Sequence, residues 1–121
     1  MSRGRKCNTR PIPTWTEVER GLLAGWLEGE GTFVVSRREG KRPQVSIAGL
    51  ATDQDVVEKM GQLVGANIRT RPVKNREHKP VWRFSLSGPR AITVMMEIYS
   101  LLGERRKAAV RNCLTAWEHS A

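Results

Sequence analysis

Gly21–Phe33 reads Gly-Leu-Leu-Ala-Gly-Trp-Leu-Glu-Gly-Glu-Gly-Thr-Phe and carries glycines four residues apart within an apolar segment. The leucines and the tryptophan predict a buried helix, although glycine inside a helix costs about 0.5–1 kcal/mol relative to alanine. Glycines with this spacing share one side of a helix, where a second backbone can approach closely. We therefore expect a partner helix against this side. The expected contacts are Gly21, Leu22, Ala24, Gly25, Glu28 and Gly29.

Two glutamates, Glu28 and Glu30, stand in the last turn of this predicted helix, just before Gly31. The C-terminus of a helix carries partial negative charge and disfavours each carboxylate there by roughly 0.3–1 kcal/mol. A cation should offset them. If the partner helix comes from a second copy of the chain, two acidic ends meet, and a divalent cation with oxygen ligands is the expected neutraliser.

Residues 23–31, Leu-Ala-Gly-Trp-Leu-Glu-Gly-Glu-Gly, resemble the nine-residue signature of the LAGLIDADG homing endonucleases, and Thr32-Phe33 resembles the small-aromatic pair that often follows it. Both family aspartates are glutamates here, which keeps the oxygen donors. The resemblance implies a homodimer formed through the helix of residues 21–31. It also implies that Glu30 binds Mg²⁺ or Mn²⁺. The alternative interpretation is a tightly packed core helix with a polar end.

Positive charge dominates the chain and is unevenly distributed. Lys and Arg number 21 against 12 Asp and Glu, which gives a net charge of +9. Acidic residues gather in the predicted helices, whereas the bases gather in residues 3–10, 37–42, 69–83 and 105–111. A surface adapted only for solubility mixes the two signs more evenly, so we expect a polyanion as partner.

The two cysteines, Cys7 and Cys113, are far apart and lack zinc-finger spacing to another Cys or His. Reduced intracellular thiols are therefore expected. No apolar run approaches the roughly 18–20 residues of a membrane span, and the basic N-terminus lacks the apolar stretch of a signal peptide. We expect a cytoplasmic protein encoded by a prokaryote or a phage, or an organellar protein, but not a secreted one.

The 121 residues predict a flexible basic arm over residues 1–13 and one domain over residues 14–121. Capping boxes at Thr14/Glu17 or Thr16/Glu19 can begin the first helix, which runs to about Gly29. Apolar periodicity predicts the remaining elements. These are strands over residues 32–38 and 44–48, a helix from Thr52 or Asp53 to Gly65, strands over residues 68–73 and 81–86, and helices over residues 89–102 and 104–117.

This order predicts an α+β domain of αββαββα type plus a C-terminal helix, with one antiparallel four-stranded sheet and helices on one face. It also resembles single-motif members of the LAGLIDADG family, in which the sheet forms a saddle over DNA. Within the pattern, Val81 is expected on the open face of the sheet, and Met96 in the buried stripe of the third helix.

The open face of the sheet should carry arginines, a glutamine and small hydroxyl side chains. Arg and Gln can make bidentate contacts with base edges in the major groove, which admits a two-stranded β-ribbon. The alternative is a solvated polar face. The face is predicted to hold Thr32, Ser36, Arg38, Gln44, Ser46, Arg69, Arg71, Arg83 and Ser85, and the turns add Lys41, Arg42, Lys74, Arg76 and Lys79.

The resemblance implies hydrolysis of double-stranded DNA at a long, roughly palindromic site, with a metal that activates water. Lys107 is the first choice for a basic catalytic residue near that water, and Arg106 or Arg105 are alternatives. Each of them could instead position a phosphate or simply lie on the surface.

One position departs from the family pattern. Many active members carry a glutamine near the end of the second strand, where this chain has Gly49, Ala51 or Asp53. Two other functions therefore stay open, a non-cleaving DNA-binding protein of the same fold and an RNA-binding intron-splicing accessory. The gene could lie in an intron or an intein, or be free-standing.

Overall fold

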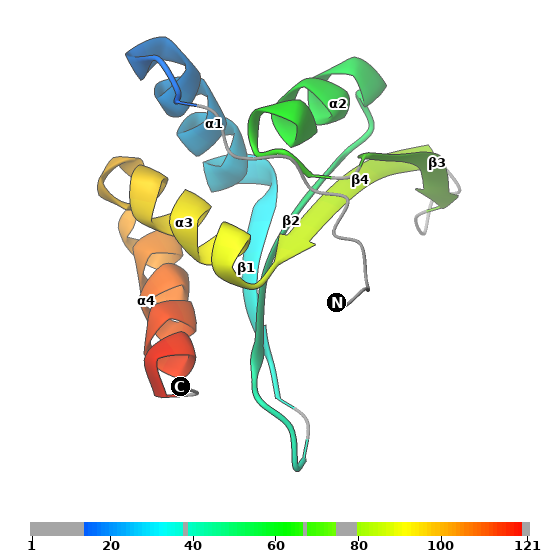
Figure 1. Ribbon diagram of the computed structural model, residues 1–121. Helices are drawn as coiled ribbons and strands as arrows, with labels where there is room; N and C mark the ends of the chain where they lie inside the picture. Colours follow the sequence, from blue (N-terminus) through cyan, green and yellow to red (C-terminus); the bar gives the residue numbers. More distant parts are fainter. Residues whose placement is uncertain (1–13, 38, 67, 75–79, 120–121) are drawn as a thin grey trace, which may run out of the picture.

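The structure is a computed structural model that describes residues 14–37, 39–66, 68–74 and 80–119, with residues 68–74 described as backbone. The expected arm and three predicted DNA contacts, Arg38, Arg76 and Lys79, lie outside these residues. The elements in chain order are α1 (Glu17–Glu30), β1 (Gly31–Ser36), β2 (Gln44–Ala51), α2 (Gln54–Leu63), β3 (Ile68–Lys74), β4 (Pro80–Ser87), α3 (Pro89–Ile98), the 3-10 turn η1 (Tyr99–Leu101) and α4 (Glu104–His119) (Figure 1).

The strands form one antiparallel sheet in the order β1-β2-β4-β3. Alternate residues of β1, β2 and β4 are buried beneath the helices, and the residues between them face solvent or are half-exposed. All four α-helices pack against strands. The predicted α+β class and element order are therefore confirmed. Among the described residues, no helix combines the length and apolarity needed to cross a lipid bilayer.

Helix α1 begins at the second of the two predicted capping boxes. The backbone N–H of Glu19 donates to Thr16 Oγ1 at 3.0 Å, and the backbone N–H of Thr16 donates to Glu19 Oε1 at 2.9 Å. This exchange satisfies two backbone donors that a helix N-terminus otherwise leaves unpaired. Further along the helix, Leu23 and Leu27 pack into the core, and both side chains are fully buried.

Gly49 lies where α1 meets the middle of the sheet. The rings of Trp26 on α1 and Phe84 on β4 stack with centroids 6.0 Å apart. A Cβ on Gly49 would lie 2.6 Å from Trp26 Cζ3 and 2.9 Å from Phe84 Cε2. Strand β2 can therefore pass these two rings only with a glycine at this position.

Val81, expected on the open face, is only 7% exposed but is not part of the core cluster, so its burial does not contradict that placement. The predicted orientation of Met96 is wrong. Met96 is 64% exposed, because α3 buries Ala91, Met95 and Ile98 and turns Met96 away from them.

Candidate nucleic-acid interface

One face of α1 is left uncovered by the residues that the structure describes. At 100° per residue, Val18, Leu22 and the three glycines fall within an arc of about 100° that faces away from Leu23 and Leu27. Val18 is 78% exposed and Leu22 is 42% exposed. A Cβ added to any of these glycines would meet nothing within 4 Å. The face carries no charged side chain. The glycines are Gly21, Gly25 and Gly29.

Ala24 and Glu28 do not lie on this face, although both were predicted at the interface. Ala24 is 2% exposed and packs in the core of its own chain. Glu28 is half-buried, and its Oε1 accepts a hydrogen bond from the backbone N–H of Gly103 at 2.8 Å. The Glu28 carbonyl accepts a second bond from Arg106 Nε at 2.9 Å. These two bonds hold the start of α4 against the last turn of α1.

Glu30 is the last residue of α1 and is exposed. Among the described residues, its carboxylate has no hydrogen-bond or ion-pair partner. Its oxygen donors suit Mg²⁺, which is bound through few carboxylates and keeps much of its water. Within the described ranges, no three His, Cys, Asp or Glu side chains gather to enclose a metal. The described part of the chain therefore offers a metal ion one exposed carboxylate here rather than an enclosed site.

The basic residues of α4 make contacts that do not involve Glu30. Lys107 Nζ lies 3.9 Å from Glu104 Oε2 and 5.5 Å from the centroid of the Tyr99 ring. The Tyr99 hydroxyl in turn accepts a hydrogen bond from Arg111 Nη1 at 2.7 Å. Lys107 and Arg111 are four residues apart and share one side of the helix. The prediction did not pair Lys107 with Arg111, although their spacing of four residues in the sequence indicates it.

The open face of the sheet has its side chains in rows that cross the strands. The register defines three complete rows, Thr32–Ala48–Ser85, Val34–Ser46–Ser87 and Leu50–Arg83–Arg69. The first two rows contain no charged side chain and nothing larger than valine. Val34 is 43% exposed and Leu50 is 42% exposed. The alternation predicted from the sequence already put Val34 and Ala48 on this side of their strands, but the predicted set of DNA contacts left out Val34, Ala48, Leu50 and Ser87.

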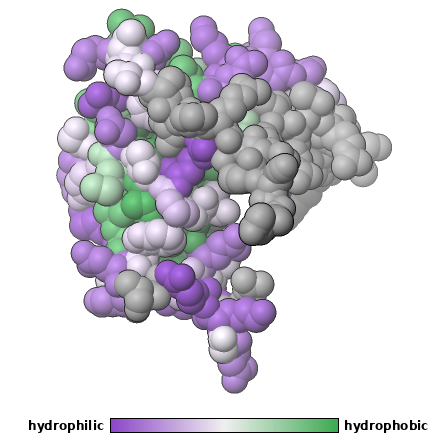
Figure 2. Space-filling model, viewed as in Figure 1, coloured by the Kyte–Doolittle hydropathy of each residue, from purple (hydrophilic) through white to green (hydrophobic). Residues whose placement is uncertain are grey.

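Most of the predicted DNA contacts that can be located are accessible. Those exposed or half-exposed are Thr32, Ser36, Lys41, Arg42, Gln44, Ser46, Arg83 and Ser85. Arg69, Arg71 and Lys74 lie on β3, whose backbone alone is described. The β1–β2 hairpin extends beyond the helices (Figure 1), and its tip is hydrophilic (Figure 2). Gly40 supplies the positive φ of 73° that its turn requires.

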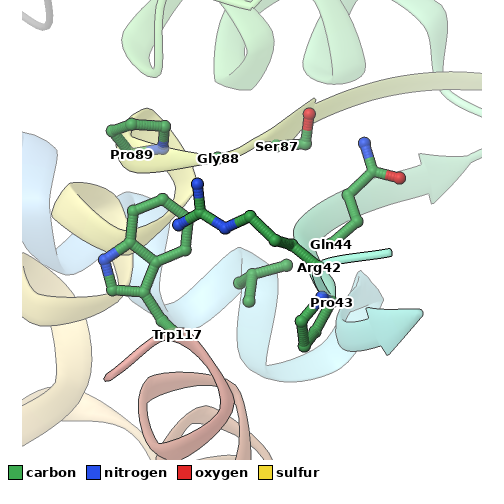
Figure 3. Close-up of a pocket in the computed structure, with 8 residues that line it drawn as sticks. Arg42, Pro43, Gln44, Ser87, Gly88, Pro89 and Trp117 are labelled. Atoms are coloured by element: carbon green, nitrogen blue, oxygen red, sulfur yellow. The ribbon is translucent and has the colours of Figure 1, made fainter. Parts of the chain in front are cut away.

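Arg42 differs from the other predicted contacts. It lines a pocket of about 280 Å³ at the root of the hairpin, together with Gln44, Ser87 and Trp117. Its side chain crosses the pocket, and the guanidinium group lies beside the indole of Trp117 on α4 (Figure 3). Arg42 thus joins the hairpin to the last turns of α4.

The end of β2 offers no equivalent of the family glutamine. Gly49 is buried and faces inward, and Ala51 is half-buried. Asp53 lies beyond the strand at the start of α2. A side-chain hydrogen bond with Asp55 raises the pKa of Asp53 and lowers the pKa of Asp55. None of the three positions therefore supplies a neutral amide that could orient water.

No model of a protein family matches the chain, and none of the curated proteins matches it in sequence. Solved structures do match. The homing endonuclease I-CvuI, in complex with uncleaved DNA, superposes with a TM-score of 0.61 over 82% of this chain and 65% of its own, at 16% identity. The chain has the fold of the LAGLIDADG homing endonucleases.

Two more structures with the LAGLIDADG fold give similar values. The archaeal intron-encoded homing endonuclease I-Vdi141I, complexed with DNA, has a TM-score of 0.62 over 83% of this chain and 67% of its own, at 14% identity. The LAGLIDADG meganuclease I-AabMI, bound to uncleaved DNA, has a TM-score of 0.65 over 82% of this chain and 35% of its own, at 16% identity. The chain thus spans less than two thirds of the matched I-CvuI chain and about a third of I-AabMI. Structures of I-CvuI were determined in the presence of Mg or Ca.

Proposed function

We propose that the protein is a site-specific double-strand DNA endonuclease that acts as a homodimer with Mg²⁺ or Mn²⁺ on a long, roughly palindromic site. The observation that carries the proposal is the position of Glu30. Its carboxylate, which has no partner among the described residues, belongs to the last residue of α1, one residue after Gly29 of the uncovered face, and directly precedes β1, the first strand of the open sheet. One helix therefore joins the expected dimer contact, the metal ligand and the DNA face.

Homodimerisation is supported by the uncovered glycine face. A helix that exposes Val18 and Leu22 beside three bare glycines leaves an apolar surface to solvent. The same helix in a second copy could pack there at short range, since no side chain stands between the backbones. With the two helices running in the same direction, such a two-fold contact would bring both copies of Glu30 to the same end and predicts two related half-sites in the DNA.

Double-stranded DNA as substrate is supported by the charge of +9 and by the polar face of the sheet. A bound divalent metal would activate water and stabilise the leaving oxygen. In this chain Glu30 would hold the metal through its carboxylate oxygens. Thr32 and Ser85, in the row next to α1, would contact the DNA, and Arg83 would read a base edge at the end of the sheet.

The roles of the bases on α4 follow from their contacts. Arg106 is a positioning residue, because its bond to the Glu28 carbonyl sets where α4 begins relative to α1. Lys107 remains the proposed basic group near the scissile phosphate, and moving it toward DNA would give up its 3.9 Å ion pair with the exposed Glu104 and its 5.5 Å contact with the Tyr99 ring. Arg105 is exposed and suited to a phosphate contact.

A non-cleaving DNA-binding protein of the same fold is the second candidate. It is favoured by the end of β2, where Gly49, Ala51 and Asp53 provide no amide to orient water. The proposed DNA face is the same in both cases, so only cleavage distinguishes them.

The test is to incubate the protein and Mg²⁺ with a plasmid library of randomised sites and to sequence the ends of linearised molecules. Staggered cuts within a recurrent near-palindrome are expected for the endonuclease. Recovery of a bound consensus sequence that stays uncut with Mg²⁺ and Mn²⁺ supports the second candidate instead. No enrichment of any duplex would overturn both.

A further inference from the structure

The middle of the open face is unlike its two ends. The two middle rows hold three serines, a threonine, an alanine and a valine, and none of these side chains is charged. Beyond them, Gln44 stands at the hairpin end, and Arg83 pairs with Arg69 at the other. Long polar side chains thus flank a central region of short ones.

Short side chains limit how the middle of the face can read DNA. Bidentate hydrogen bonding to a base edge requires an arginine, a lysine, an asparagine or a glutamine. Serine and threonine hydroxyls accept and donate, and so discriminate poorly between bases. The remaining distinctive feature of a base edge in the major groove is the C5 methyl group of thymine, which apolar side chains contact.

Two apolar side chains stand on this face with about two fifths of their surface exposed, Val34 on β1 and Leu50 on β2. Neither is needed for the core, because both point away from it. Leu50 lies opposite Arg83 in the end row, and Val34 lies opposite Ser46 in a middle row. Ala48 adds a methyl group between them on β2.

We propose that this apolar set, Val34, Ala48 and Leu50, reads C5 methyl groups of pyrimidines in the major groove. The proposal rests on the proposed binding of double-stranded DNA and names the chemistry by which the sheet recognises it. Thymine and 5-methylcytosine both present this methyl group, whereas uracil and cytosine do not. Recognition of the site should therefore respond to the methyl group itself, apart from the hydrogen-bonding pattern of the base pair.

The experiment uses a duplex recovered from the randomised library and measures its dissociation constant in Ca²⁺. Each thymine of a half-site is replaced singly by uracil, which removes only the methyl group. Each cytosine is replaced singly by 5-methylcytosine. We expect uracil at one to three central positions to weaken binding about fourfold each, the effect of losing one buried methyl-sized group. At a position where thymine is the preferred base, cytosine should weaken binding. 5-Methylcytosine at the same position should restore part of the lost affinity.

Variants assign the effect to residues. Leu50→Asn and Val34→Ser, which leave no methyl group at either position, should each abolish the uracil effect at one position while the others persist. Met96→Gln, which changes a still more exposed apolar side chain on the helical side, should leave every uracil effect in place. Circular dichroism checks that the variants are folded. Because Leu50 and Val34 lie on different strands, their two substitutions test methyl recognition independently.

The outcomes separate this inference from the proposed function. Tight, sequence-selective binding that is indifferent to uracil at every position would overturn methyl recognition and leave DNA recognition intact. A uracil effect that survives in both Leu50→Asn and Val34→Ser would show that other residues read the methyl groups. Failure to bind any duplex would overturn the proposed function as well.

Discussion

The side chain of Glu28 accepts a hydrogen bond from the backbone N–H of Gly103, 75 residues further along the chain, at 2.8 Å. The bond joins the last turn of α1 to the residue that precedes α4. Because α1 ends in Glu30 and the first turn of α4 carries the basic residues 105–107, this contact sets how the proposed metal ligand and the proposed bases are placed.

We predict that Glu28→Ala lowers the free energy of unfolding by about 1–2 kcal/mol, since it removes a charged acceptor of a backbone N–H. Glu28→Gln keeps an acceptor oxygen and should lose less than half of that. Glu118→Ala, exposed near the end of α4, is the control and should stay within about 0.5 kcal/mol. Urea denaturation measures all three. Equal stability of Glu28→Ala and wild type would mean that the contact does not hold α4.

Gly25→Leu should abolish dimerisation without loss of the fold. No atom lies within 4 Å of the added Cβ, and replacing a helical glycine should stabilise the monomer by up to about 1 kcal/mol. Light scattering at micromolar concentration should give a dimeric mass for wild type and a monomeric mass for the variant. Ala108→Leu, on the exposed side of α4, should stay dimeric. A dimer that survives Gly25→Leu would place the interface elsewhere.

Gly49→Ala should destabilise the protein by about 1–3 kcal/mol, because its methyl group would overlap the stacked rings of Trp26 and Phe84. The neighbouring Ala48→Ser, on the open face, should change stability by less than about 0.5 kcal/mol. Thermal unfolding compares the two variants. If Gly49→Ala were as stable as wild type, the rings could not be packed as closely as the geometry shows.

Arg83→Ala should relax base preference at one position in each half-site and cost about 1–3 kcal/mol of binding free energy there. Lys41→Ala, in the β1–β2 turn, should weaken binding to all sequences alike and lower the slope of log affinity against log salt by about 1. Binding titrations at several salt concentrations, on the selected site and on single-base variants, separate these effects. If Arg83→Ala lowered the affinity for all sequences equally, Arg83 would contact a phosphate rather than a base.

Burial raises the pKa of the Cys113 thiol, whose side chain faces the core from α4. A raised pKa means that folding favours the neutral thiol. Its contribution to the free energy of unfolding is therefore complete below the pKa of this thiol in the unfolded chain, and it is lost as the pH rises through the pKa in the folded protein. In a Cys7→Ser background, iodoacetamide at pH 8 should react on the order of a hundredfold more slowly with folded than with unfolded protein. Similar rates would show that Cys113 is accessible.

Local features of the fold could be predicted from the sequence because their causes are local. The capping box at Thr16 and Glu19, the alternation of Val45 and Ile47, and the proline that begins α3 each act within a few residues. Met96 shows the limit of such patterns. Several apolar residues of α3 could form its buried stripe, and which of them did so depended on how the helix packs on α1, α4 and the sheet.

Site features that depend on distant contacts could not be predicted in this way. Glu28 stands only two residues before Glu30 in the sequence, yet its partner Gly103 lies 75 residues further along the chain. The need for glycine at position 49 arises from rings on α1 and β4. Ala24 fits a stripe of small residues by spacing, but its angular position on α1 turns it to the core.

The most direct test of the central claim compares strand cleavage by wild type, Glu30→Gln and mixed dimers on the selected DNA site in Mg²⁺. We predict that wild type linearises a supercoiled plasmid, that Glu30→Gln binds it with similar affinity but leaves it intact, and that mixed dimers nick one strand. Cleavage by Glu30→Gln at the wild-type rate, or an intact plasmid in all three reactions despite tight binding, would contradict an endonuclease that uses Glu30 from each subunit.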